Sequence, residues 1–203
     1  MKLNQKLKLI CCFLLFTNSF FAQTAKELNS NGIEKSKNND YEGAILEYNK
    51  AIEVDQTNAS IYFNRAISKG KLKDYEGAIS DYTTSISLKE DPNTYYARAL
   101  MKVELKDYEG VLEDLNKSFE AKKTNPNFYF LRGTCKNLLK DYKGAIEDLS
   151  TSLEINPELT KAYFIRGMIR ISQNNKEEGC ADLHKAKEQN YPKADEMILK
   201  FCN

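Results

Sequence analysis

The residues that could do chemistry in this chain are few. Its one histidine, His184, follows Cys180 by four residues, which places both side chains on one face of a helix. Such a pair could supply a nucleophile and its general base. It would also need a third group to orient the imidazole and a pocket to hold a substrate. We therefore expect His184 to be a surface residue and the chain not to be an enzyme.

Metal and phosphate chemistry have no better candidates. No second histidine is present to share a metal with His184, and no glycine-rich phosphate loop lies near it. Acidic residues such as Glu113 and Asp114 are scattered at positions expected to face solvent. We predict no catalytic residue, no metal site and no cofactor.

Composition limits the partners. Of 203 residues, 30 are Lys or Arg and 29 are Asp or Glu, for a net charge of +1. Nucleic acid and anionic lipid call for a clustered excess of positive charge. The balance therefore argues against both as the main partner, and the composition is that of a folded soluble protein.

The first 22 residues have the pattern of a secretory signal peptide. Lysines at positions 2, 6 and 8 precede a short apolar run, Leu9 to Phe16. That run is too short to be a stable membrane anchor. We predict cleavage after Ala22, export to the periplasm, cell envelope or medium, and no transmembrane segment in the mature chain.

An acidic-aromatic turn recurs along the rest of the chain. Four copies begin at Asp40, Asp74, Asp107 and Asp141, at intervals of 34, 33 and 34 residues, and a degraded fifth copy begins at Lys176. A helical run precedes and follows each turn, and Asp74 can cap the helix that begins after it. A period of this length indicates a stack of helical hairpins.

Small and large residues alternate at fixed places in each hairpin, as interlocking helices require. The small residues of the first helices are Gly32, Ala66, Ala99, Gly133 and Gly167. The large residues of the second helices are Tyr48, Tyr82, Leu115, Leu149 and Leu183.

These motifs resemble tetratricopeptide repeats. The resemblance rests on residues 62–66 (Tyr-Phe-Asn-Arg-Ala), 129–133 (Tyr-Phe-Leu-Arg-Gly) and 163–167 (Tyr-Phe-Ile-Arg-Gly), each followed by a turn and a second helix. It implies an all-α, right-handed α-solenoid with a capping helix over 191–203. Five repeats would span 25–190, divided as 25–58, 59–91, 92–125, 126–159 and 160–190. The C-terminal sequence and the export signal are similar to those of exported repeat proteins of Bacteroidetes-type bacteria.

In the last four repeats, an arginine of the first helix stands 16 residues before an aspartate of the second, and in the first repeat the same offset joins Asn31 and Glu47. The pairs are Arg65–Asp81, Arg98–Asp114, Arg132–Asp148 and Arg166–Asp182. A constant offset across a hairpin predicts ion pairs between its two helices. A row of arginines that binds an anionic ligand is the functional alternative.

A disulfide is predicted near the C-terminus. Cys180 and Cys202 lie at equal distances on either side of Tyr191, where Tyr191-Pro192 indicates a turn between antiparallel helices. Folding the chain there brings the two cysteines level, and export permits oxidation. Two unpaired thiols in apolar packing remain the alternative.

The resemblance also implies where a partner would bind, because first helices line the concave side of such a solenoid. The residues expected in this groove are Phe63, Asn64, Ile67, Asn93, Tyr96, Leu100, Asn127, Phe130, Thr134, Phe164 and Met168. Packing between neighbouring helices is the alternative role for the aromatic residues.

The predicted function is a protein–protein interaction scaffold or adaptor of envelope assembly that binds an apolar peptide or helix in this groove. The partner's identity is open. A homo-oligomeric structural module and a small-ligand or glycan-binding envelope protein are the alternatives.

Overall fold

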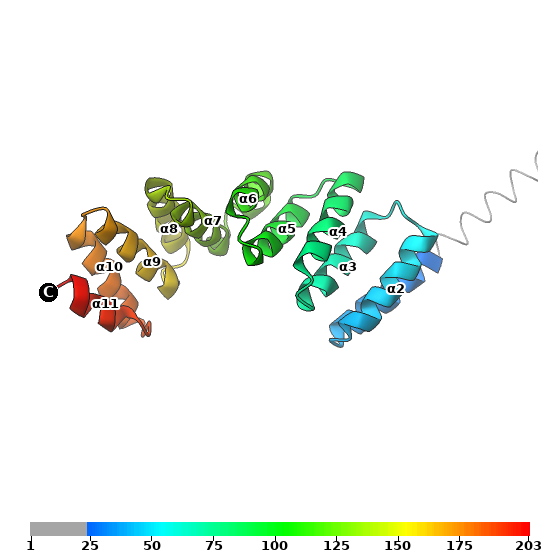
Figure 1. The fold of residues 1–203 in the computed structure, drawn as a ribbon, viewed down its shortest axis with the longest axis horizontal. Helices are drawn as coiled ribbons and strands as arrows, with labels where there is room; N and C mark the ends of the chain where they lie inside the picture. Colours follow the sequence, from blue (N-terminus) through cyan, green and yellow to red (C-terminus); the bar gives the residue numbers. More distant parts are fainter. Residues whose placement is uncertain (1–23) are drawn as a thin grey trace, which may run out of the picture. The chain divides into compact units, whose positions relative to one another are not determined.

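The computed structural model describes residues 24–203, and every regular element in this range is a helix (Figure 1). A first helix over residues 24–37 is followed by α2 (Tyr41–Val54), α3 (Ala59–Lys71), α4 (Tyr75–Leu88), α5 (Pro92–Glu104), α6 (Tyr108–Lys122), α7 (Pro126–Leu138), α8 (Tyr142–Ile155), α9 (Thr160–Ser172), α10 (Lys176–Glu188) and α11 (Ala194–Phe201). The predicted all-α class is confirmed. The predicted signal peptide and its cleavage after Ala22 lie outside the described residues.

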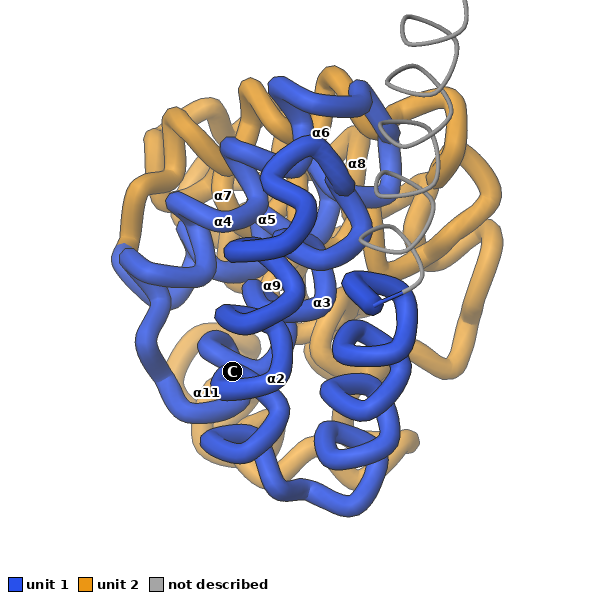
Figure 2. Tube along the Cα trace, turned by 90° about the vertical axis from the view of Figure 1, so that its right-hand side faces the viewer, with its two compact units in different colours: residues 1–105 blue, residues 106–203 orange. Residues whose placement is uncertain are grey.

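The chain forms two compact units, which Figure 2 colours separately. Unit 1 ends at Leu105, and unit 2 comprises Lys106–Asn203. In unit 1, α3 packs on both α2 and α4, and α5 packs on α4. In unit 2, α7 packs on α6 and α8, α9 packs on α8 and α10, and α11 packs on α10. The boundary falls inside the third predicted repeat, and the division into five repeats stays a prediction.

The acidic-aromatic turn fixes the start of four second helices, α2, α4, α6 and α8, whereas α10 begins without a side-chain cap. The Asp74 carboxylate accepts a hydrogen bond from the Gly77 N–H at 3.0 Å, and the same bond joins Asp40 to Gly43, Asp107 to Gly110 and Asp141 to Gly144. A Cβ at Gly77 would collide with the Asp74 carboxylate, so the glycine makes room for the cap.

The residue before each cap reverses the chain. Lys73 has φ 65°, in the left-handed region, and the Asp74 N–H then donates to the Lys69 carbonyl at 3.0 Å. The same conformation occurs at Asn39, Lys106, Lys140, Asn174 and Asn190. Each of these left-handed residues thus lies in the turn that ends one helix, before the next helix begins.

Small residues let the helices of a hairpin approach closely. A Cβ on Gly133 of α7 would lie 3.1 Å from both the Ala145 carbonyl oxygen and the Leu149 side chain of α8. Leu149 and Ala145 belong to a buried cluster that also contains Ala162 and Ile169 of α9. The core therefore runs from one hairpin into the next, as a stack of repeats requires.

Candidate functional site

The residues predicted to line the groove lie on the first helices of the hairpins, and each unit carries its own set. In unit 1 they form the α3–α5 face, made of Phe63, Asn64, Ile67, Asn93, Tyr96 and Leu100. In unit 2 we use the name α7–α9 face for the predicted residues Asn127, Phe130, Thr134, Phe164 and Met168 together with Leu138, an exposed residue one helical turn after Thr134.

The aromatic residues of the α3–α5 face are only partly available. Phe63 is half-buried, and its ring meets the Tyr82 ring edge-on with centroids 5.6 Å apart. Ile67 and Tyr96 are also half-buried, and burial raises the pKa of Tyr96. Leu100 is 39% exposed. The predicted aromatic row therefore packs between helices with one edge and meets solvent with the other.

Asparagines complete this face. The Asn64 side-chain amide donates to the side-chain oxygen Oδ1 of Asn29, on the first helix, at 3.1 Å. Asn93 is exposed and donates to the Asp91 carboxylate at the start of α5. These side chains keep hydrogen-bonding groups beside the half-buried rings.

The α7–α9 face has the same plan but is more apolar at one end. Phe130 packs against the core cluster, and Phe164 stacks on Tyr191 with ring centroids 4.6 Å apart. Met168 and Thr134 are half-buried, and Asn127 is exposed. Leu138 is 50% exposed; the sequence signalled it only by its place one helical turn beyond Thr134.

Two pockets lie at matching places in the two units. A pocket of about 400 Å³ in unit 1 is lined by residues that include Ser60, Phe63 and Lys89. A pocket of about 510 Å³ in unit 2 is lined by residues that include Lys161 and Tyr191. Each lies where a first helix begins and the loop after the second helix returns to it.

Three of the predicted arginine–aspartate pairs are formed, each within one hairpin. The Arg65 guanidinium donates through Nε and NH2 to Asp81 at 2.8 and 2.6 Å. Arg132–Asp148 and Arg166–Asp182 have the same two-pronged geometry. Arg98 and Asp114 belong to different units, and that pair stays a prediction.

Each of these carboxylates also forms an ion pair with a second basic side chain, which the sequence analysis did not predict. The ammonium groups of Lys69 and Lys136 lie 2.9 and 2.8 Å from Asp81 and Asp148. Arg170 does the same for Asp182 at 2.7 Å. The available signal was a basic residue four positions after each arginine, one helical turn away.

The arginines also reach back to the preceding hairpin. NH1 of Arg65 donates to Asn49 of α2 at 2.7 Å, and NH1 of Arg166 donates to Ser150 of α8 at 2.9 Å. Hydrogen bonding to Asp148 raises the pKa of the Arg132 guanidinium. Because Arg65, Arg132 and Arg166 are already paired and mostly buried, they hold hairpins together and do not form a free anion-binding row.

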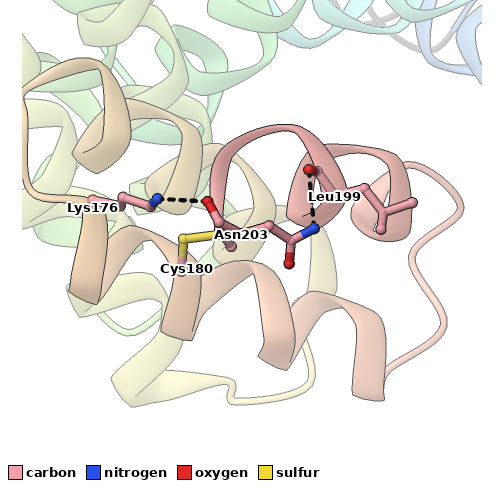
Figure 3. Close-up of a disulfide and its surroundings, with 5 residues drawn as sticks. Lys176, Cys180, Leu199 and Asn203 are labelled. Carbon is pink, nitrogen blue, oxygen red and sulfur yellow. Dashed lines mark hydrogen bonds between the residues drawn. A yellow bond between two sulfur atoms is a disulfide. The ribbon is translucent and has the colours of Figure 1, made fainter.

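The cysteines are placed by the fold. A disulfide joins Cys180 of α10 to Cys202, just after α11, with Cα atoms 5.7 Å apart (Figure 3). Cys180 is therefore not a free nucleophile beside His184, which is exposed on α10. Cys135 is a buried thiol, and burial raises its pKa to about 11. In residues 24–203 no cluster of three or more His, Cys, Asp or Glu side chains could hold a metal ion.

Comparison with known proteins agrees with this geometry. A family described as "TPR repeat" matches residues 36–73, and one described as "Tetratricopeptide repeat" matches residues 59–92 and 126–159. No match was found among curated protein sequences.

Solved structures share the fold at low identity. The crystal structure of YrrB, described as a TPR protein with an unusual peptide-binding site, is 19% identical, covers 89% of this chain and 97% of its own, and has a TM-score of 0.80. A MamA crystal structure is 19% identical, with coverages of 85% and 95% and a TM-score of 0.77. MamA from Desulfovibrio magneticus RS-1 is 16% identical, with coverages of 82% and 94% and a TM-score of 0.76. These similarities and the successive helical pairs confirm the predicted α-solenoid class.

Among the described helices, none has the length and apolar character needed to cross a bilayer.

Proposed function

Because this chain is a tetratricopeptide repeat protein, we propose that it is a non-catalytic scaffold that binds an apolar peptide or an amphipathic helix of a partner protein. Each unit offers such a partner its own docking surface, the α3–α5 face in unit 1 and the α7–α9 face in unit 2. The observation that carries this proposal is the repeated stripe of half-buried rings, asparagines and exposed leucines on first helices.

The chemistry of these faces suits a protein ligand. Half-buried aromatic rings give a rigid apolar floor, and little side-chain entropy is lost when a partner covers them. Leu100 and Leu138, at 39% and 50% exposure, supply aliphatic surface that a partner can bury. Exposed Asn93 and Asn127 lie at the starts of α5 and α7, where they can hydrogen-bond a partner's backbone.

We further propose that the scaffold acts in the envelope of the cell after export. The N-terminal basic and apolar pattern supports export, as does a disulfide in the folded domain. An adaptor role in envelope assembly would follow from a binding surface without catalytic groups.

Binding by the two faces can be tested without knowing the partner. Short random peptides are displayed and selected on the folded protein, and the enriched peptides are measured against Leu138→Asp and Leu100→Asp. Leu46→Asp on α2 is the matched control, because Leu46 is 61% exposed but lies on a second helix.

We expect Leu138→Asp to weaken the selected peptides by about 10-fold or more, because interface energy concentrates in a few apolar contacts. Leu46→Asp should leave them unchanged. Peptides that bind all three variants equally would show that the two faces are not the site.

Self-association through the ends of the stack is disfavoured by the first helix. Glu27 and Glu34 are exposed at the positions where α3 has the fully buried Ile61 and Ser68 and α9 has Ala162 and Ile169. A second-helix edge from another copy would have to bury these carboxylates unpaired. We expect sedimentation at micromolar concentration to show a monomer.

A further inference from the structure

The terminal helix α11 sits on α10 as α9 sits on α8. In α8, Ile146 packs against the core cluster that contains Ala162 and Ile169 of α9. Cys180 is the residue of α10 that corresponds to Ile146, 34 positions later. The disulfide to Cys202 therefore stands where the earlier hairpin has an apolar contact.

The non-covalent packing of α11 on α10 is weak. Leu153 of α8, which belongs to the core cluster, is replaced in α10 by Lys187, whose ammonium forms an exposed ion pair with Asp195. Exposed pairs of this kind contribute little. α11 has 8 residues against 13 in α9, and only Ala194 and Ile198 of α11 are buried.

A further contact lies at Asn203. Lys176 of α10 donates to the Asn203 carbonyl oxygen at 3.1 Å, whereas the bond from the Asn203 side-chain amide to the Leu199 carbonyl oxygen stays within the α11 segment (Figure 3). Both bonds are exposed to water. A helix of this length does not persist when it is undocked, so α11 depends on its covalent tie.

Both cysteines of the disulfide are partly exposed to solvent, where a reductant can contact them. Cys180 and Cys202 are half-buried, whereas Cys135 is 1% exposed. A small dithiol or a dithiol oxidoreductase can therefore meet the bond without prior unfolding of the stack.

We propose that the Cys180–Cys202 disulfide is a thiol-controlled latch that holds α11 over the edge of the last hairpin. A dithiol attacks one sulfur as its thiolate and forms a mixed disulfide. Its second thiol then closes the reductant's own disulfide, and two electrons and two protons pass to the protein as two thiols. Released α11 uncovers the side of α10 that bears Cys180 and Lys187, the residues that hold Cys202 and Asp195.

The ring of Tyr191 connects the latch to the proposed binding face. Tyr191, in the connection between α10 and α11, stacks on Phe164 of the α7–α9 face. Release of α11 frees this connection and exposes more of Phe164. This last consequence rests on the proposed function, but the latch itself does not.

Hydrogen exchange measured by mass spectrometry tests the latch without a partner. The oxidised protein, the protein in dithiothreitol, and the Cys180→Ser/Cys202→Ser variant without reductant are compared. We expect amides of α11 to exchange about 100-fold faster in the latter two, as loss of a loop-closing bond predicts. Amides of α7 and α8 should keep their protection.

A rescue variant separates a latch from general loss of stability. Lys187→Leu, added to the cysteine-free variant, restores the apolar contact that Leu153 makes in α8 and should slow exchange in α11 again. Unchanged protection of α11 after reduction would overturn the proposal. Equal loss of protection in α7, α8 and α11 would overturn it as well, because the bond would then stabilise the whole unit.

Discussion

The two units repeat the same hairpin but fill its centre with different chemistry. Unit 1 buries tyrosines, Tyr48 and Tyr82, where unit 2 buries leucines, Leu115, Leu149 and Leu183. The capping aspartates, the arginine–aspartate pairs and the small residues are shared. The geometry of the repeat is therefore set by turns, close approaches and ion pairs, and the large central residue can vary in kind.

That variation gives unit 1 groups that can titrate in its core. Burial raises the pKa of Tyr82 to about 12 and also raises that of Tyr48 to about 12, with a smaller opposing effect from its hydrogen bond with Ser68. The leucines of unit 2 have no such property. The comparison predicts common responses where the units agree and different ones where they do not.

The largest effect should come from a feature that both units share. Asp148→Ala leaves Arg132 and Lys136 half-buried without their carboxylate and should lower the free energy of unfolding by about 3–5 kcal/mol. Asp81→Ala should do the same in unit 1, because Arg65 and Lys69 lose the same partner. Urea denaturation of each variant measures both.

A double-mutant cycle separates pairing from packing. Arg132→Met and Asp148→Leu together should cost less than the sum of the two single changes, because Asp148→Leu alone leaves both Arg132 and Lys136 unpaired, whereas the double variant leaves only Lys136. If the losses of unfolding free energy from the two single changes are additive, Arg132 and Asp148 act independently and the ion pair does not stabilise the hairpin.

Alkaline pH should distinguish the units. A tyrosine in the unfolded chain ionises near pH 10, whereas folded Tyr82 does so near 12. Between these values the unfolded state loses its proton first, so stability is intact below pH 10 and is lost as pH rises through 12. For Tyr82 the loss is on the order of 2 kcal/mol.

Tyr82→Leu gives unit 1 the residue of unit 2 and should remove this loss. Guanidinium denaturation at pH 9 and pH 12 compares the two proteins. An equal alkaline loss in Tyr82→Leu and the parent would refute the assignment to Tyr82.

The buried thiol of Cys135, whose pKa rises from 9 to about 11, should make unit 2 lose stability in a lower pH range, between about 9 and 11. Cys135→Ala should remove this loss.

Local features were predictable from sequence where one residue determines them. Asp74 caps its helix because the cap needs only a side chain and the next three residues. Arg132 meets Asp148 because a hairpin of fixed turn length brings residues at a fixed offset together. Cys180 meets Cys202 for the same reason.

Features that depend on how closely two helices pack were not predictable in this way. Phe63 was expected in the groove, but it is half-buried and its ring packs against the Tyr82 ring of α4. The same sequence pattern fits both roles, because a residue between two packed surfaces is apolar in either case. The share of each ring left to a partner depends on packing distances that no spacing encodes.

The helix caps should give a smaller effect that is equal in the two units. Asp74→Ala in unit 1 and Asp141→Ala in unit 2 each remove one carboxylate–amide hydrogen bond, to Gly77 and Gly144. Each change should lower the free energy of unfolding by about 1 kcal/mol. Thermal denaturation measures it, and Asp→Asn at the same positions is the control that keeps a capping oxygen. A loss as large from Asn as from Ala would assign the effect to charge.

The smallest effect should be a gain in stability at the residue before the cap. Lys73 and Lys140 have φ 65° in both units, a conformation that glycine adopts without the steric penalty of a side chain. Lys73→Gly and Lys140→Gly should therefore each raise the free energy of unfolding by about 0.5–1 kcal/mol, after the greater entropy of glycine in the unfolded chain is offset. Asn39→Gly is the matched control. Asn39 has φ 63°, but asparagine tolerates this region, so the gain there should be smaller. Equal gains at all three positions would mean that left-handed strain at lysine does not limit the stability of the turn. The two units would then differ only in the residues of their cores.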